Sequence, residues 1–329
     1  MKIVKRIVGA LILPAAMFVI MFIACHAAGK TYFGTWTMWR TLIPSIAVSM
    51  TSAMGIGIQF KNGRMDFSGG AIMLLAAIIA GNVALQHGNS PVLFAFLCII
   101  LCVALSLVTA VMYVYGRLPI VISTIGIALL YESITPLIFN GAGVNLVATT
   151  SLSQFSRFPL AIFPLVGAFT VYAVYNYLTV AGKQSRLLAN NQSAAVNIGI
   201  NEGKNVIITY VFSGLIFGFA TMLYAPSGIL KASYSSLSTV GSLFSNILPV
   251  FIGLMLSQFC GDTIGILLGS VTLCLMSFGL QAIFSAEMGS AITMVITGVF
   301  ILVINTVSSQ GSIWIAAIKN SLMRPKAEA

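Results

Sequence analysis

The sequence predicts an all-α polytopic membrane protein with about ten transmembrane helices. Of its 329 residues, 59% are hydrophobic and 7% are charged, and the mean hydropathy is +1.04. Apolar stretches close to the length that crosses a bilayer as a helix recur along the whole chain. This composition excludes a soluble domain and favours one transmembrane domain over residues 1–329.

The first apolar stretch, Ile7 to Ala28, follows a basic start and at first resembles a signal peptide. The apolar part of a signal peptide has about 7 to 15 residues, whereas this stretch is long enough to span a bilayer. We therefore expect it to remain as the first transmembrane helix. Nine further spans are expected at Thr41 to Phe60, Phe67 to Leu85, Pro91 to Tyr115, Pro119 to Phe139, Pro159 to Val180, Val206 to Ala225, Leu243 to Phe259, Thr263 to Phe284 and Ser290 to Val307.

The basic residues predict the orientation of these spans. With the N-terminus in the cytoplasm, Lys30, Arg40, Arg157 and Lys231 lie outside. Twelve basic residues then lie inside, as the positive-inside rule expects: Lys2, Lys5, Arg6, Lys61, Arg64, Arg117, Lys183, Arg186, Lys204, Lys319, Arg324 and Lys326. Both termini are then cytoplasmic, and the net charge of +10 follows from topology without a nucleic-acid partner. Trp36, Trp39, Tyr172, Tyr175 and Tyr177 are expected at the membrane interfaces, near the ends of spans.

Glycine spacing indicates close helix packing in the second half of the chain. Gly261, Gly265 and Gly269 follow a G-x-x-x-G-x-x-x-G pattern, and Gly214 and Gly218 form a shorter version. Spans two to five and seven to ten start in opposite directions across the membrane, so a repeat between them would be inverted.

The longest polar interval is the loop at 182–205. Within it, Asn191, Ala194, Ala195, Gly199 and Ile200 follow the pattern N-x-x-A-A-x-x-x-G-I, which predicts a short helix closed by a left-handed glycine. Ala194, Ala195 and Ile198 are expected to share a small apolar face. Because so short a helix is unstable alone, we expect the membrane domain on one side and a partner on the other. An ordinary polar loop with one helical turn is the alternative.

This loop resembles the coupling helix of permeases of bacterial ABC importers of the ribose and branched-chain amino-acid type, which carry G-N-x-x-A-A-x-x-x-G-I. Asn190 and Gln192 depart from the usual Gly and Glu of that family. The resemblance implies that Asn191, Ala194, Ala195, Gly199 and Ile200 contact an ATPase subunit. It covers about residues 40 to 307.

A second stretch is similar to the G-I-D-L-S-x-G motif of the same family, through Gly63, Asp66, Ser68 and Gly70. Arg64 and Met65 occupy the space of a single Ile. Asp66 and Ser68 either cap the next helix, with Gly70 permitting close packing, or line the transport pathway.

Glu132 lies near the middle of a span, where an ionisable side chain is costly and is a functional candidate. The preceding segment, which contains Thr124, resembles the family's A-T-L-G motif, but Glu132 and Ser133 stand where the family often has Arg-Gly. Glu132 either meets a hydroxylated solute or, protonated, bonds to a neighbouring helix.

The family motif V-I-G-G-T-S-L-x-G-G-x-G is interrupted in residues 251–262, where the Gly-Thr-Ser and Gly-Gly are absent. This departure would suit a subunit that pairs with a different permease.

The resemblance implies a transmembrane subunit of an ATP-driven, binding-protein-dependent sugar importer in the bacterial plasma (inner) membrane. It would act as a dimer with a second copy or a paralogous permease, surrounded by the lipid bilayer, with an ATPase subunit and an extracytoplasmic solute-binding protein as partners. The chain itself is expected to be no enzyme and to bind no metal or other cofactor, because ATP and Mg²⁺ belong to the ATPase. Nucleosides or amino acids as solutes, and an ion-coupled transporter acting alone, remain alternatives.

Overall fold

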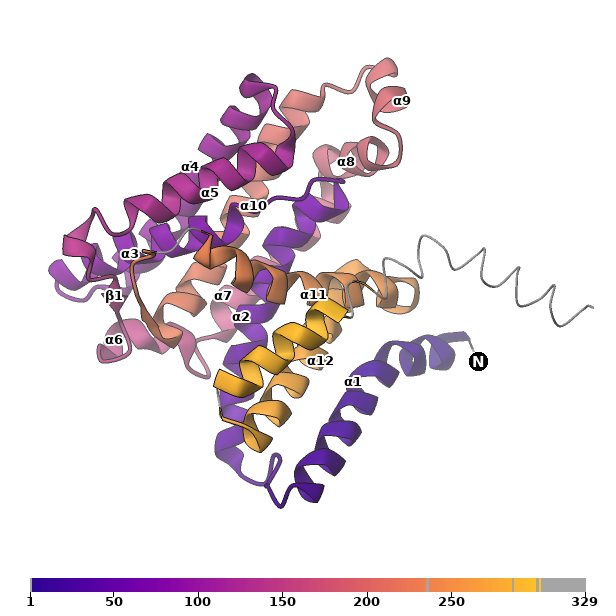
Figure 1. The fold of residues 1–329 in the computed structure, drawn as a ribbon. Coiled ribbons are helices and arrows are strands. Elements are labelled where there is room, and N and C mark those ends of the chain that lie inside the picture. The colour runs from indigo at the N-terminus through magenta and orange to yellow at the C-terminus, as the bar shows by residue number, and fades with distance from the viewer. Residues whose placement is uncertain (1, 235–236, 286, 300–301, 303–329) are drawn as a thin grey trace, which may run out of the picture.

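The computed structural model describes residues 2–234, 237–285, 287–299 and 302, and it is built almost wholly of helices (Figure 1). Within that part of the chain, seven helices are long and apolar enough to cross a membrane. They are α1 (Lys2–Ala27), α2 (Trp36–Lys61), α3 (Gly69–Gln86), α4 (Pro91–Gly116), α10 (Glu202–Tyr224), α11 (Ser238–Cys260) and α12 (Asp262–Ile283). An eighth candidate span consists of α7 (Ile162–Ala173) and the π-helix η3 (Val174–Leu178) together with α8 (Val180–Asn190), into which they bend by 69°.

Two shorter apolar helices, α5 (Ile120–Ile134) and the helix Glu287–Val299, occupy the remaining predicted spans. The helical membrane fold is thus confirmed, and the prediction of about ten spans holds approximately. The inverted repeat stays a prediction. The end of the tenth predicted span and the basic residues Lys319, Arg324 and Lys326 lie outside the described residues.

The connections contain short elements at two opposite ends of the molecule (Figure 1). One end carries α8 and α9 (Gln192–Asn197). The other carries η1 (Phe139–Gly141), β1 (Val144–Asn145), α6 (Thr150–Ser153), η2 (Gln154–Ser156), η4 (Ala225–Ser227) and β2 (Ile229–Leu230). We call these the α9 end and the β1 end.

The predicted glycine contacts join α10 to α4 and α12 to α11. A Cβ built on Gly218 would lie 2.7 Å from Cα of Ile99, and one on Gly214 would lie 2.8 Å from Cα of Val103, so α10 packs backbone to backbone on α4. Gly265 and Gly269 lie against the backbone of α11. Gly261 differs, because it is the turn residue between α11 and α12, with φ of +79°.

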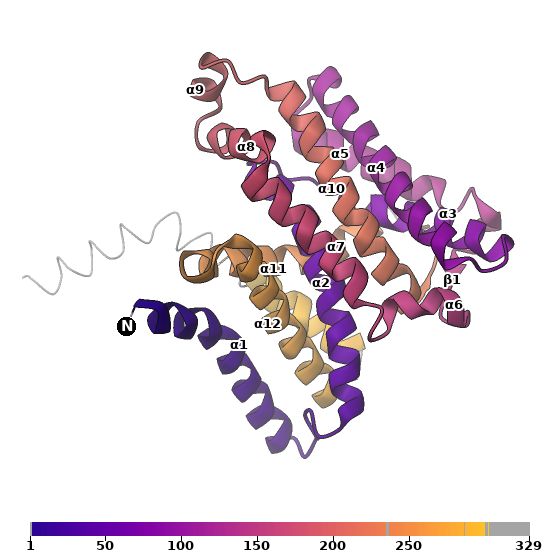
Figure 2. The same cartoon turned by 180° about the vertical axis from the view of Figure 1, so that it is seen from behind.

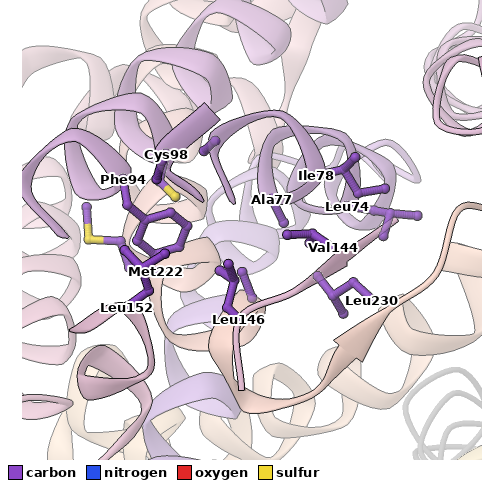
Figure 3. Close-up of a cluster of buried hydrophobic side chains, with 13 residues drawn as sticks. Leu74, Ala77, Ile78, Phe94, Cys98, Val144, Leu146, Leu152, Met222 and Leu230 are labelled. Atoms are coloured by element: carbon purple, nitrogen blue, oxygen red, sulfur yellow. The ribbon is translucent and has the colours of Figure 1, made fainter. Parts of the chain in front are cut away.

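The β1 end is held by a pair of strands and an apolar cluster. β1 pairs antiparallel with β2, Val144 facing Leu230 and Asn145 facing Ile229. Figure 3 shows the side chains of this cluster packed between the strands and helices α3 and α4. The loops around residues 140–158 and 227–234, which are far apart in the sequence, therefore form one surface.

Helix α1 runs along the edge of the molecule beside α12, as both views show (Figures 1 and 2). The phenol of Tyr32, just after α1, donates a hydrogen bond of 2.9 Å to the carbonyl of Leu275, and Cys25 is fully buried.

The interfacial prediction is wrong for two of the five aromatic residues. Trp36, Trp39 and Tyr177 are exposed, but Tyr172 and Tyr175 are buried inside the helix bundle. Proximity to the end of a span does not show which face of the helix a side chain occupies.

Candidate functional site

The predicted short helix of the polar loop is present as α9, and its two ends are stabilised by local contacts. The side chain of Asn191 accepts a hydrogen bond of 3.0 Å from the amide of Ala194, which caps the helix start. Gly199 adopts φ of +93°, the conformation expected just after a helix end. The amide of Ile200 then bonds to the carbonyl of Ala195 at 3.2 Å.

The two faces of α9 differ from the single apolar face predicted. Ala195 is buried with Ile200 against Leu188 of α8, so these three residues form the inner face. Ala194 and Ile198 point outward, and Ile198 is 71% exposed. Val196 and Leu187 are also exposed, at 46% and 48%. We call Leu187, Ala194, Val196 and Ile198 the foot surface.

A rigid arm connects the foot surface to the membrane helices. It consists of α7, η3, the bend at Thr179, and α8. The Thr179 hydroxyl accepts from the amide of Gly182 at 3.0 Å and donates to the carbonyl of Tyr175 at 2.7 Å. A Cβ on Gly182 would collide with that same carbonyl oxygen, so the bend requires glycine there. Single turns of π-helix of this kind occur often at functional sites.

Four buried polar side chains join the arm to two other helices. Asn62, after α2, donates to the Tyr175 phenol (3.1 Å), which donates to Ser185 of α8 (2.8 Å). Ser185 donates in turn to Asn205 of α10 (3.0 Å), and Asn205 donates to the carbonyl of Ala181 (2.9 Å). We call Asn62, Tyr175, Ser185 and Asn205 the polar network. Because all four are at most 7% exposed, any motion of α8 must move these helices or break buried hydrogen bonds.

The Asp66 motif lies in the connection between α2 and α3. Asp66 Oδ1 accepts hydrogen bonds from the amide (2.7 Å) and the hydroxyl (2.6 Å) of Ser68, so the carboxylate fixes the turn that precedes α3. Ser68 is the N-cap residue of α3, but its side chain makes no capping hydrogen bond. Burial raises the pKa of Asp66, an effect that the donors from Ser68 oppose.

Glu132 is buried and caps the start of a neighbouring helix. Its carboxylate accepts from the amides of Ser238 (3.2 Å) and Thr239 (2.7 Å) and from both of their hydroxyls. These are the first two residues of α11, so Glu132 satisfies donors that a helix start leaves free. Of the two roles left open by the sequence, the structure shows the bond to a neighbouring helix.

The remaining pathway candidates are buried near this cap or in α5. Gly70 lies where an added Cβ would be 2.8 Å from the carbonyl of Thr239, so the starts of α3 and α11 meet. Thr124 is fully buried and donates to the carbonyl of Ile120 at 2.9 Å. The structure thus brings Gly70 and Glu132 together around Thr239. The assignment of all five candidates to the pathway stays a prediction.

Comparison with known families identifies the chain. The model of the family described as "Branched-chain amino acid transport system / permease component" matches residues 37–305. The chain belongs to this permease family. The resemblance to permeases of ABC importers of the ribose and branched-chain amino-acid type is therefore confirmed, and the permease is a multi-pass protein of the inner membrane.

Individual relatives of the permease are named as sugar importers. It is 22% identical to the galactose/methyl galactoside import permease protein MglC of Escherichia coli over 74% of this chain and 78% of MglC. It is 24% identical to the ribose import permease protein RbsC of Bacillus subtilis over 80% of this chain and 81% of RbsC. For RbsC of Escherichia coli the identity is 25%, over 73% and 76%. No solved structure matches the permease significantly.

Some residues of the permease site could not be identified from the sequence. Lys61, at the end of α2, pairs with Asp262 at the start of α12 and lies over the ring of Tyr172 at 5.3 Å from its centroid. Asn205 of the polar network, which bonds to Ser185 and to the carbonyl of Ala181, was also missed. The one available signal was the stripe of Asn205, Thr209 and Ser213 at helical spacing on an apolar span.

Proposed function

We propose that this permease is the transmembrane subunit of an ATP-driven importer that moves a sugar, delivered by an extracytoplasmic binding protein, across the bacterial plasma membrane. The named relatives that import ribose and galactose support a sugar as the solute. In this proposal the permease is not itself catalytic, and ATP and Mg²⁺ are bound by a separate ATPase subunit. The N- and C-termini and the α9 end face the cytoplasm, as the distribution of basic residues favours.

The observation that carries the proposal is the foot surface. Exposed apolar residues on a polar loop mark a site of protein interaction. The opposite, inner face of this loop consists of Leu188, Ala195 and Ile200, which bury one another. The foot surface is therefore not needed for packing within the loop and can bind a partner. In the proposal, ATPase subunits bind this surface, and their closure moves the arm and the helices that the polar network joins to it. Two permease subunits enclose the pathway between them.

Ile198→Glu tests the ATPase assignment. A charge on this exposed residue would be desolvated in an apolar interface while leaving the fold intact, so association with the ATPase should weaken at least about tenfold, or roughly 1.4 kcal/mol. The measurement is pull-down of the ATPase together with uptake in reconstituted vesicles. Gln154→Glu, an exposed residue at the β1 end, is the control and should leave association unchanged. Undiminished association and uptake for Ile198→Glu would contradict the proposal.

The β1 end provides the surface proposed for the binding protein. The two loops paired through β1 and β2 carry the exposed basic residues Arg157 and Lys231, and Arg40 is exposed on α2. A partner with acidic side chains fits this surface best, since complementary charges speed association.

Arg157→Glu should therefore lower binding-protein-dependent uptake by several-fold at low salt and by less at high salt, because exposed charges are screened. Lys30→Glu, a charge reversal in the connection between α1 and α2, should have a smaller effect. Equal effects of the two variants would indicate only a general dependence on charge and would argue against docking on the paired loops.

A further inference from the structure

A polar hollow lies at the α9 end, where the arm leaves the membrane helices. Its volume is about 320 Å³, and residues from the end of α2, the start of α12, η3 and α8 line it. Most of the described lining residues carry polar side chains, among them Lys61, Asn62, Tyr175, Arg186, Asn190 and Asp262. We call this hollow the arm hollow.

The arm hollow lies at the surface of the bilayer. Lys61 is the last residue of α2 and Asp262 is the first of α12, and both helices are long enough to span a membrane. The 69° bend turns α8 away from the direction of α7, and α8 lies beside the end of α2 (Figures 1 and 2). Because α8 carries the exposed cations Lys183 and Arg186, it belongs outside the hydrocarbon core. The arm hollow therefore opens at the level of the lipid headgroups.

The arm hollow carries an excess of positive charge. Its described lining includes two cations, Lys61 and Arg186, and one carboxylate, Asp262, which pairs with Lys61. One positive charge remains. Arg186 donates one hydrogen bond, of 3.4 Å, to the carbonyl of Asn176. An ammonium has three hydrogens and a guanidinium has five, so both cations keep donors for a ligand.

An amide adds a donor on the side of α2. Asn62 is 7% exposed and gives one hydrogen of its amide to the Tyr175 phenol at 3.1 Å, so the second hydrogen remains. The donors therefore come from two sides of the hollow, from Lys61 and Asn62 at the end of α2 and from Arg186 on α8.

These features select the chemistry of a ligand. A metal cation would be repelled by the excess positive charge, and an acyl chain would remove the charged side chains from water without replacing their partners, which is costly. A phosphodiester carries one negative charge, which balances the hollow, and its oxygens can accept from both sides. A phosphate monoester carries about −1.5 to −2 at pH 7 and would leave the hollow negative.

We propose that the arm hollow binds the phosphodiester of an anionic phospholipid between Lys61 of α2 and Arg186 of α8. A guanidinium can bind phosphate through two parallel hydrogen bonds, and basic pockets between membrane helices on the cytoplasmic side bind anionic headgroups. The bound phosphate connects the arm to α2 in addition to the polar network. The proposal rests on the proposed function only for its effect on transport.

Titration of the purified permease with short-chain lipids tests the binding. In a neutral detergent, dihexanoylphosphatidylglycerol should raise the thermal midpoint of the wild type. Dihexanoylphosphatidylcholine should raise it less, because its choline adds a cation. Arg186→Gln should lower the apparent affinity for the anionic lipid by at least about tenfold, because it removes charge-assisted hydrogen bonds. Lys183→Gln is the matched control: it removes the same charge from an exposed residue of α8 outside the described lining, and its effect should not exceed about twofold.

Vesicles test the effect on transport. For the assembled importer, uptake per ATP hydrolysed should be several-fold higher in vesicles that contain phosphatidylglycerol than in phosphatidylcholine alone. Arg186→Gln should lose this difference and Arg186→Lys should keep part of it. ATPase association should be unchanged in both variants, because Arg186 is not part of the foot surface.

The other outcomes would each overturn the proposal. Equal losses of affinity in Arg186→Gln and Lys183→Gln, or no shift of the wild type by the anionic lipid, would mean that the hollow holds no headgroup. A shift by inorganic phosphate as large as that by the lipid would make free phosphate the ligand. Loss of ATPase association in Arg186→Gln without any lipid dependence would mean that an acidic side chain of the ATPase occupies the hollow. The lipid titration needs neither sugar nor ATP, so its failure can be told from failure of the proposed function.

Discussion

Glu132→Ala is expected to abolish uptake, because it removes the acceptor for the donors at the start of α11. The amides of Ser238 and Thr239 and both hydroxyls would lose this acceptor in a buried site. Each hydrogen bond that is removed costs about 0.5 to 1.5 kcal/mol, so the total loss is several kcal/mol. The contact between α5 and α11 should therefore fail to form, and the loss of uptake should follow from this folding defect rather than from a lost contact with the solute.

The measurement is the yield of folded permease in detergent and its thermal midpoint, followed by uptake. Glu287→Ala is the matched control, because Glu287 is exposed. Glu132→Gln should be intermediate, since its amide oxygen still accepts from Thr239 while its NH₂ faces hydroxyls that already act as donors. If Glu132→Ala folds normally and loses uptake alone, Glu132 is a pathway residue and its carboxylate is not needed to hold the start of α11.

The sequence was sufficient where the physical cause is local. The start and end of α9 depend on Asn191 and Gly199, which act on amides and dihedral angles within a few residues, and the short helix and its closing glycine were predicted. Membrane spans could also be predicted from the sequence, because each depends on the hydrophobicity of one continuous stretch. Gly214 and Gly218 are local patterns too, although their partner helix, α4, was not predictable.

Contacts between distant residues were not predictable from the same patterns. Glu132 was recognisable as a costly acid, but its donors lie more than a hundred residues later. Tyr175 was assigned to the interface by its place near a span end, whereas the 69° bend and the π-helix turn it inward to Ser185.

Tyr175→Phe is expected to uncouple the permease from its ATPase. The phenol oxygen accepts from Asn62, donates to Ser185 and lies 3.4 Å from the Thr209 hydroxyl, so its removal breaks the hydrogen bond between the arm and Asn62 and leaves these buried polar groups with one partner fewer. The ring remains and fills the same volume, so the fold should survive at a cost of about 1 to 3 kcal/mol. The foot surface is untouched, and ATPase association should be unchanged.

Uptake per ATP hydrolysed is the quantity that separates this role from a purely structural one. We expect Tyr175→Phe to reduce it by about tenfold, as a loss of roughly 1.4 kcal/mol in the coupling free energy would. Tyr177→Phe is the control, because Tyr177 lies two residues later in the same π-helix but is 51% exposed. Ser185→Ala should also lower the ratio, because it removes the bonds of Ser185 to Tyr175 and Asn205, and the double variant should lose less than the sum of the two single variants, because the Tyr175–Ser185 bond is common to both. Additive losses would show that the two hydroxyls act separately, and an unchanged ratio in Tyr175→Phe would mean that motion of α9 reaches the membrane helices through the backbone of the arm alone.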